Sequence, residues 1–182
     1  MFALLLSHAL ASEVGTPDPS KHDGAPPVKK LVAVATLEPR SGSTVTGTVT
    51  FLQKKDTVKV VIKLAGATPG DHAVHIHEKG DCSAPDATSA GSHFNPMQME
   101  HGDHAAAMHH PGDFGNVTVK AEGIGAKSLT TTGFTLAPGQ PLSVNALAVI
   151  VHEKADDFSQ PTGNAGGRQA CGVITMQGNA KK

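Results

Sequence analysis

The segment Val58-Lys-Val-Val-Ile-Lys-Leu64 carries the pattern that decides the fold. Apolar side chains recur there at every second position, at Val58, Val60, Ile62 and Leu64. Because successive side chains of a strand point to opposite faces, a period of two is typical of a strand with one face in the core. The segment therefore predicts a β-strand.

The same alternation continues on both sides of this segment. Short apolar runs separated by turn residues predict eight strands, at 31–37, 44–52, 58–64, 72–78, 117–121, 128–136, 147–151 and 170–176. No segment has a convincing period of 3.6, so we expect an all-β fold, an eight-stranded Greek-key β-barrel or sandwich. Two connections, 79–115 and 153–169, are too long for hairpins, and long loops in a compact β domain usually carry function.

Composition agrees with this architecture and excludes several functions. The chain has 182 residues, which suits one domain with a sizeable core. It has 20 Gly, 12 Pro and six Phe but no Trp or Tyr, so we expect many turns and a mainly aliphatic core. The formal net charge is −1, which argues against a nucleic-acid partner and against a polybasic membrane patch.

The N-terminal part predicts export. Residues 1–11, MFALLLSHALA, are apolar and end in a small-x-small pattern, so we interpret them as a signal-peptide remnant; the alternative is a frayed apolar terminus. The run is too short to span a bilayer. Residues 12–28 are rich in Pro and Gly and predict a disordered linker, which leaves a folded domain at 29–182. We expect a periplasmic or otherwise exported protein.

Two histidines on one predicted strand open the question of a metal. Alternation puts Val74 and Ile76 on one face of the 72–78 strand, and His75 and His77 on the face away from the core. A histidine pair at this spacing presents two nitrogens to one metal ion, but exposed pairs of this kind are also common. The pair alone does not decide between the two.

Most of the other histidines gather in the first long connection. The chain has 11 histidines, and a short stretch carries His93, His101, His104, His109, His110 and Asp113, while His152 ends the 147–151 strand. Imidazoles with one carboxylate and no cysteine ligand indicate zinc or copper. The alternative is a solvated histidine-rich loop that binds metals adventitiously.

The only two cysteines of the chain are Cys82 and Cys171. An even count in an exported chain predicts a disulfide, which would tie the ligand-bearing loop to the barrel. Closing so long a loop is worth roughly 4 kcal/mol in the chain-entropy model. Two buried free thiols are the alternative.

Five ordered motifs together carry a family resemblance. They are His75-Ile-His-Glu-Lys-Gly-Asp-Cys82, Gly91-Ser-His-Phe-Asn-Pro96, His110-Pro-Gly-Asp-Phe-Gly-Asn116, Val151-His-Glu-Lys-Ala-Asp-Asp157 and Gly163-Asn-Ala-Gly-Gly-Arg-Gln-Ala-Cys-Gly-Val173. From residue 30 to residue 177 the chain resembles the copper/zinc superoxide dismutases, of the bacterial periplasmic type. The resemblance implies dismutation of superoxide to O₂ and H₂O₂ as an antioxidant defence, with one copper and one zinc per subunit.

The resemblance also implies roles for individual residues. Copper would be held by His75, His77, His93 and His152. Zinc would be held by His93, His101, His110 and Asp113, so that His93 bridges the two metals and also acts as a general acid. Asp156 would orient His75 and His101, Arg168 would position the anionic substrate, and Thr162 would lie at the mouth of the channel.

The chain departs from the family pattern in three places. The 157–163 stretch, DFSQPTG, is short and has no charge after Asp157, unlike the longer charged loop of the animal enzymes. Without Trp or Tyr the sequence does not decide between a monomer and a homodimer. The zinc loop carries additional potential ligands, for which we hypothesise copper collection; the alternative is a merely variable loop. These ligands are His104, His109, Met97 and Met99.

A different class of function has to be weighed against the enzyme. A non-catalytic copper or zinc buffer could keep the same fold and some of the ligands. Such a protein would have no need of a substrate anion site, so Arg168 together with the complete ligand set favours the enzyme.

Overall fold

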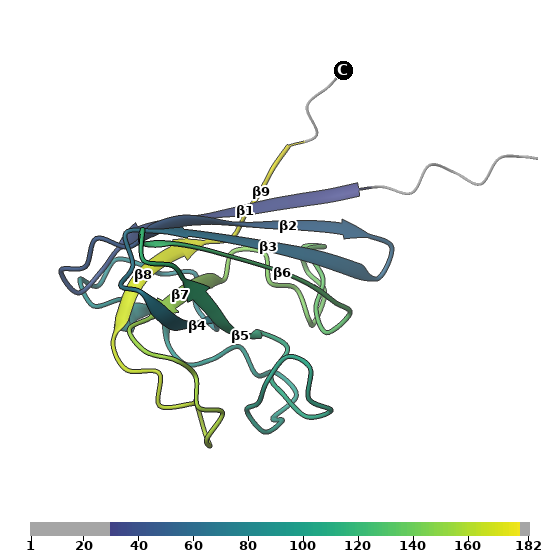
Figure 1. Ribbon diagram of the computed structural model, residues 1–182. Helices are drawn as coiled ribbons and strands as arrows, with labels where there is room; N and C mark the ends of the chain where they lie inside the picture. Colours follow the sequence, from purple (N-terminus) through teal and green to yellow (C-terminus); the bar gives the residue numbers. More distant parts are fainter. Residues whose placement is uncertain (1–29, 179–182) are drawn as a thin grey trace, which may run out of the picture.

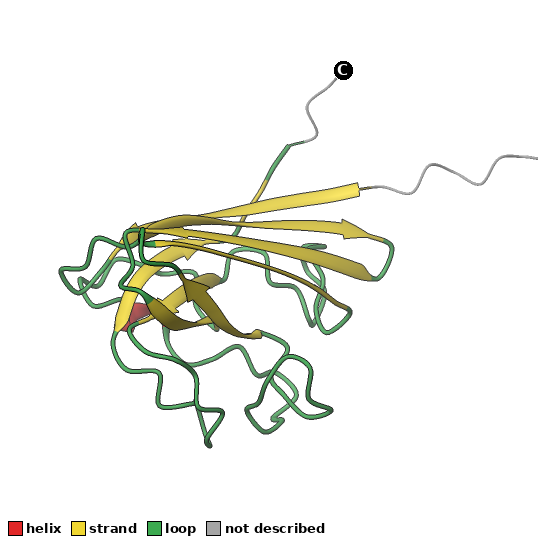
Figure 2. Cartoon of the chain, viewed as in Figure 1, coloured by secondary structure: helices red, strands yellow, loops and turns green. Residues whose placement is uncertain are grey.

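The computed structural model of the chain describes residues 30–178. The predicted signal-peptide remnant and the predicted linker lie outside the described residues. Within 30–178 the structure is built almost entirely of strands and loops, with one short 3-10 helix, η1 (Thr88–Ala90) (Figure 2). No helix in this part of the chain is long and apolar enough to cross a membrane. The all-β prediction is confirmed.

Nine strands follow one another along the chain. They are β1 (Lys30–Pro39), β2 (Thr46–Lys54), β3 (Thr57–Ala65), β4 (Gly70–His77), β5 (Asp113–Val119), β6 (Ile124–Thr131), β7 (Ala148–His152), β8 (Arg168–Val173) and β9 (Thr175–Met176). The eight predicted strands correspond to β1–β8, with the two-residue β9 paired to β1.

The sheet closes on itself. Its strand order is β2-β3-β6-β5-β4-β7-β8-β1, and β1 pairs with β2 as well as with β8. The neighbours β3 and β6, and β4 and β7, are not consecutive in the chain, so two connections cross the barrel as a Greek key requires. Figure 1 shows β1, β2, β3 and β6 as one layer over β4, β5, β7 and β8, with the long loops extending beyond the second layer.

The core follows the predicted alternation. In β3 the side chains of Val58, Val60 and Ile62 are fully buried, while Lys59 and Lys63 between them are exposed. Three phenylalanines cluster in the core, where Phe51 lies 6.3 Å from Phe114 and 6.2 Å from Phe134 between ring centroids. The core therefore combines aliphatic side chains with a small aromatic cluster.

Three predicted strands have a boundary that is wrong by more than two residues. The 117–121 strand is β5 and begins at Asp113; the 128–136 strand is β6 and ends at Thr131; the 170–176 strand is divided into β8 and β9. Phe134 and Leu136, which suggested a strand beyond 131, are buried core residues of a loop. The segment was predicted as a strand because its apolar residues were interpreted as the inward face of a strand.

The predicted disulfide is confirmed. Cys82 and Cys171 are bonded across a sequence separation of 89 residues, and the described chain has no free cysteine. Cys171 packs with Ala87, Ala90 and Ile150 in a small second core. The bond therefore joins the start of the first long loop to β8.

We expect the double variant Cys82→Ser/Cys171→Ser to lose roughly 4 kcal/mol of unfolding free energy as the metal-free protein, because its unfolded chain regains the entropy of an open loop. Urea unfolding followed by circular dichroism measures the loss. Reduced wild-type protein is the control and should unfold at the same urea concentration as the variant. An unchanged midpoint would contradict this role of the bond.

Candidate metal centre

Strand β4 supplies the first two histidines. Val74 and Ile76 point into the hydrophobic core, and His75 and His77 occupy the opposite face, as predicted. That face is not open to solvent, because the long loops cover it and leave His75 fully buried and His77 only 1% exposed. The strand pairing shifts register between Ala73 and His75, an irregularity of the kind that re-aims side chains next to functional sites.

One group of four imidazoles forms at this face. The potential ligand atoms of His75, His77, His93 and His152 all lie within 4.8 Å of one another. His93 reaches the group because its backbone forms a bridge with His77, and His152 reaches it from the end of β7. Strands and loop thus bring together the four residues that the resemblance assigned to copper.

The second ring nitrogens of these histidines are held by the protein. His75 Nε2 donates to Asp156 Oδ2 at 2.7 Å, His77 Nδ1 to the carbonyl of Gly91 at 2.9 Å, and His152 Nδ1 lies 3.4 Å from the carbonyl of Gly166. The opposite nitrogens have no hydrogen-bond partner among the described residues. An imidazole fixed on one side and free on the other is the usual arrangement of a metal ligand.

A second group adjoins the first and shares His93 with it. It contains His93, His101, His110 and Asp113, again with ligand atoms within 4.8 Å of one another. The Nδ1 atoms of the three histidines lie 3.0 to 3.4 Å from the Asp113 carboxylate, yet none of them makes an aligned hydrogen bond to it. Nitrogen and oxygen atoms that lie this close without aligned hydrogen bonds between them are better explained as ligands of one shared metal ion.

Asp156 connects the two groups. Its Oδ2 accepts from His75 at 2.7 Å and its Oδ1 from His101 at 2.9 Å. Asn116 holds the backbone of Asp156 in turn, accepting from its N–H at 2.7 Å and donating to its carbonyl at 3.0 Å. The contacts predicted for Asp156 are therefore present; the Asn116 contact was not predicted.

The protonation of the buried groups suits metal binding. Burial lowers the pKa of His77 to about 2 and that of His93 to about 4, although Asp113 opposes the shift of His93. Burial raises the pKa of Asp113, but the three adjacent histidine rings outweigh it and keep that carboxylate ionised. Burial lowers the pKa of His101, while Asp113 and Asp156 outweigh it and raise the value to about 9. Neutral imidazoles and ionised carboxylates are the forms that bind metals, so His77, His93 and Asp113 are ready to bind, whereas His101 has to release a proton when a metal ion binds.

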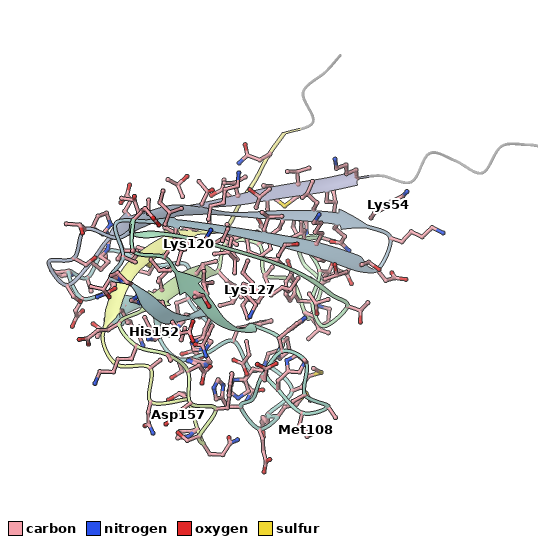
Figure 3. All side chains as sticks on the ribbon, viewed as in Figure 1. Lys54, Met108, Lys120, Lys127, His152 and Asp157 are labelled. Atoms are coloured by element: carbon pink, nitrogen blue, oxygen red, sulfur yellow. A yellow bond between two sulfur atoms is a disulfide. The ribbon has the colours of Figure 1, made fainter. Side chains whose placement is uncertain are left out.

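A pocket of about 470 Å³ leads to the first group from outside. It is lined by His77, His93 and His152 of this group and also by Thr162 and Arg168. Of the described residues that line it, Arg168 is the sole Lys or Arg. Figure 3 shows His152 beneath the strands, with Asp157 and Met108 further out in the two long loops.

Two backbone carbonyls hold the Arg168 guanidinium. Nη1 donates to Ala87 at 2.7 Å and Nη2 donates to Gly91 at 2.8 Å. The Gly91 carbonyl also accepts from His77. One backbone oxygen therefore positions both the pocket cation and a histidine of the first group.

The additional residues of the zinc loop lie apart from both groups. His104 and His109 form their own pair, with ring centroids 5.4 Å apart, and neither belongs to a group of potential ligands in the described chain. Met97 is 48% exposed. The role hypothesised for these residues and Met99 in copper collection stays a prediction.

The fold and this centre define a class of protein: an antiparallel β-barrel with two adjacent groups of potential metal ligands that share one histidine. Comparison with known proteins identifies the family. Residues 45–174 match the family described as copper/zinc superoxide dismutase, and the chain is 32% identical over 196 residues to the extracellular superoxide dismutase [Cu-Zn] of Brugia pahangi, covering 96% of both chains. The chain belongs to the copper/zinc superoxide dismutase family.

Membership determines the reaction and the cofactors. The protein is an oxidoreductase that dismutates superoxide to O₂ and H₂O₂, and it uses copper and zinc. The donor set fits both metals, because several imidazoles with an open side suit copper, and imidazoles with a carboxylate suit zinc. A catalytic function therefore replaces the metal-buffer alternative.

Proposed function

We propose that the first group of imidazoles holds the copper that performs the dismutation and that the second group holds zinc. The copper ligands are His75, His77, His93 and His152, and the zinc ligands are His93, His101, His110 and Asp113. One observation carries this assignment. Seven of the nine buried side-chain atoms without a hydrogen-bond partner in the described chain belong to these two groups, whereas buried polar atoms are normally paired.

Copper held by these residues would supply the redox chemistry that converts two superoxide ions and two protons into O₂ and H₂O₂. Arg168 attracts the small anion into the pocket and orients it, because a fixed guanidinium in a narrow cleft concentrates negative ions. Thr162 narrows the mouth of the same pocket.

His93 supplies the proton at the shared position. Its Nδ1 lies 3.4 Å from Asp113 Oδ1, so its other ring nitrogen, Nε2, faces the copper group and the pocket. When Nε2 is not bound to a metal, it could hold one proton and give it to the peroxide product, while water would supply the second proton; His93 would then be a general acid as well as a ligand. Asp156 keeps the two neighbouring rings oriented while this proton moves.

A dismutation assay on the purified protein tests the assignment. Full activity is expected with one copper and one zinc per chain, and only background activity after both metals are removed. Protein that contains both metals at this stoichiometry and remains inactive would contradict it.

We also propose that the protein acts outside the cytoplasm, as a superoxide dismutase of the bacterial periplasmic type. The apolar 1–11 segment, the disulfide and the name of the extracellular relative support export. The short 157–163 stretch supports the bacterial type. In this proposal 29–182 is the catalytic domain, superoxide is the only partner besides a possible second copy of the chain, and neither nucleic acid nor a membrane takes part. Mass spectrometry of the protein recovered from outside expressing cells tests whether cleavage follows Ala11.

A further inference from the structure

One short segment, 156–163, surrounds His101 on several sides. Asp156 Oδ1 accepts from the ring at Nε2, at 2.9 Å. The ring of Phe158 stacks on the imidazole with an interplanar angle of 27° and a centroid distance of 6.5 Å. Gly163 comes so close that a Cβ at its position would lie 2.7 Å from His101 Nε2. The second long loop is therefore built around one residue of the first.

Gln160 completes this enclosure from the backbone side. Its Oε1 accepts from the His101 N–H at 3.0 Å, and its Nε2 donates to the His101 carbonyl at 2.8 Å. The Gln160 amide thus hydrogen-bonds both the N–H and the carbonyl of His101, as the backbone of a paired β-strand would. Two bonds at fixed spacing hold the position of the His101 backbone as well as its direction.

The double contact joins two loops that are far apart in sequence. Gln160 and His101 are 59 positions apart. The chain after Gln160 continues directly to Thr162 and then to Arg168, which line the pocket. If a metal ion fixes the position of His101, the two hydrogen bonds to Gln160 can therefore also fix the segment that leads to the pocket. This connection does not involve the copper group.

We propose that Gln160 is a positioning residue that holds His101 in place for zinc and makes the order of the 157–163 segment depend on zinc occupancy. The proposal rests on the assignment of His101 as a zinc ligand. Gln160 contacts no predicted ligand atom, and its side chain is exposed, so it can be replaced without opening the core.

Zinc release to a chelator tests the first part. Gln160→Met keeps the length of the side chain and removes both polar atoms, and we expect about tenfold faster zinc release, the effect usual for residues that orient a metal ligand. Gln160→Glu keeps the acceptor for the His101 N–H and should fall between Met and wild type. Asn164→Ala is the matched control: its amide bonds only Asp157 and Ser159 within the same loop, so zinc release should be unchanged.

Hydrogen exchange tests the second part. In the wild-type protein, zinc should slow the exchange of the 157–163 amides, and in Gln160→Met most of this protection should disappear while the copper spectrum stays that of wild type. Zinc release within twofold of wild type in Gln160→Met, or undiminished protection, would overturn the proposal and leave the metal assignment intact. If His101→Ala bound zinc as tightly as wild type, the ligand assignment itself would fall, and the role of Gln160 with it.

Discussion

The variant His152→Ala is expected to lose its copper and, with it, more than 99% of its dismutase activity. Outer-shell partners of a metal already change affinity by about 10- to 100-fold, so removal of one of four direct ligands should cost at least about 100-fold. His152 is 6% exposed and lies at the end of β7 beside the pocket, so alanine leaves space at the surface of the centre and not in the hydrophobic core. The fold should therefore survive.

Metal content and activity, measured on the same preparation, check this expectation. Zinc should remain at one per chain, because His152 belongs to the first group only. His109→Ala is the matched control, a histidine of the described chain outside both groups; when copper and zinc are supplied in excess, so that copper collection is not limiting, it should contain both metals and show full activity. A His152→Ala protein with stoichiometric copper and a normal rate would contradict the copper assignment.

The strands that could be predicted well are those in which burial alternates. β3 extends only one residue beyond each end of the predicted segment, because its inward residues are all aliphatic and its outward residues include Lys59 and Lys63. β5 was predicted four residues too late, since it begins with Asp113, a fully buried carboxylate. Hydrophobic periodicity cannot detect the start of a strand where a buried side chain is a candidate metal ligand and not an apolar residue.

The candidate site also contains residues that could be predicted from the sequence and residues that could not. Its histidines, Asp113 and Arg168 could be proposed from the sequence, because their residue types and motif order carry chemical meaning. Gln160 and Asn116 could not, because an amide that holds a backbone leaves no pattern in the sequence and depends on how closely two loops approach. The burial of the histidine pair also could not be predicted from the sequence, because it depends on how the long loops fold back over β4.

The net charge of the chain did not predict the local charge of the pocket. A total of −1 excludes broad attraction of polyanions, but it does not describe the field inside a pocket. Arg168 is half-buried, and burial lowers its pKa, with Asp86 opposing the shift. Because the guanidinium is always protonated in practice, the pocket keeps one fixed positive charge beside three imidazoles.

Replacement of Arg168 by alanine is therefore expected to lower kcat/KM for superoxide by about 10- to 100-fold and to weaken its dependence on ionic strength, because steering of an anion by a cleft charge is screened by salt. Pulse radiolysis at several salt concentrations measures both the rate and its slope. This result would distinguish Arg168 from the copper ligands, because the replacement of a copper ligand removes the metal itself.

Arg168 also has a structural role that the experiment must separate from steering. It shares the Gly91 carbonyl with His77, so its removal could loosen a copper ligand as well as remove a charge. Arg168→Lys distinguishes the two effects: lysine keeps the charge but cannot donate to Ala87 and Gly91 in the same planar fork. If steering dominates, Lys retains the salt slope that Ala loses, with copper content equal in both. If Arg168→Ala with full copper shows the wild-type rate and slope, the substrate does not approach through this pocket.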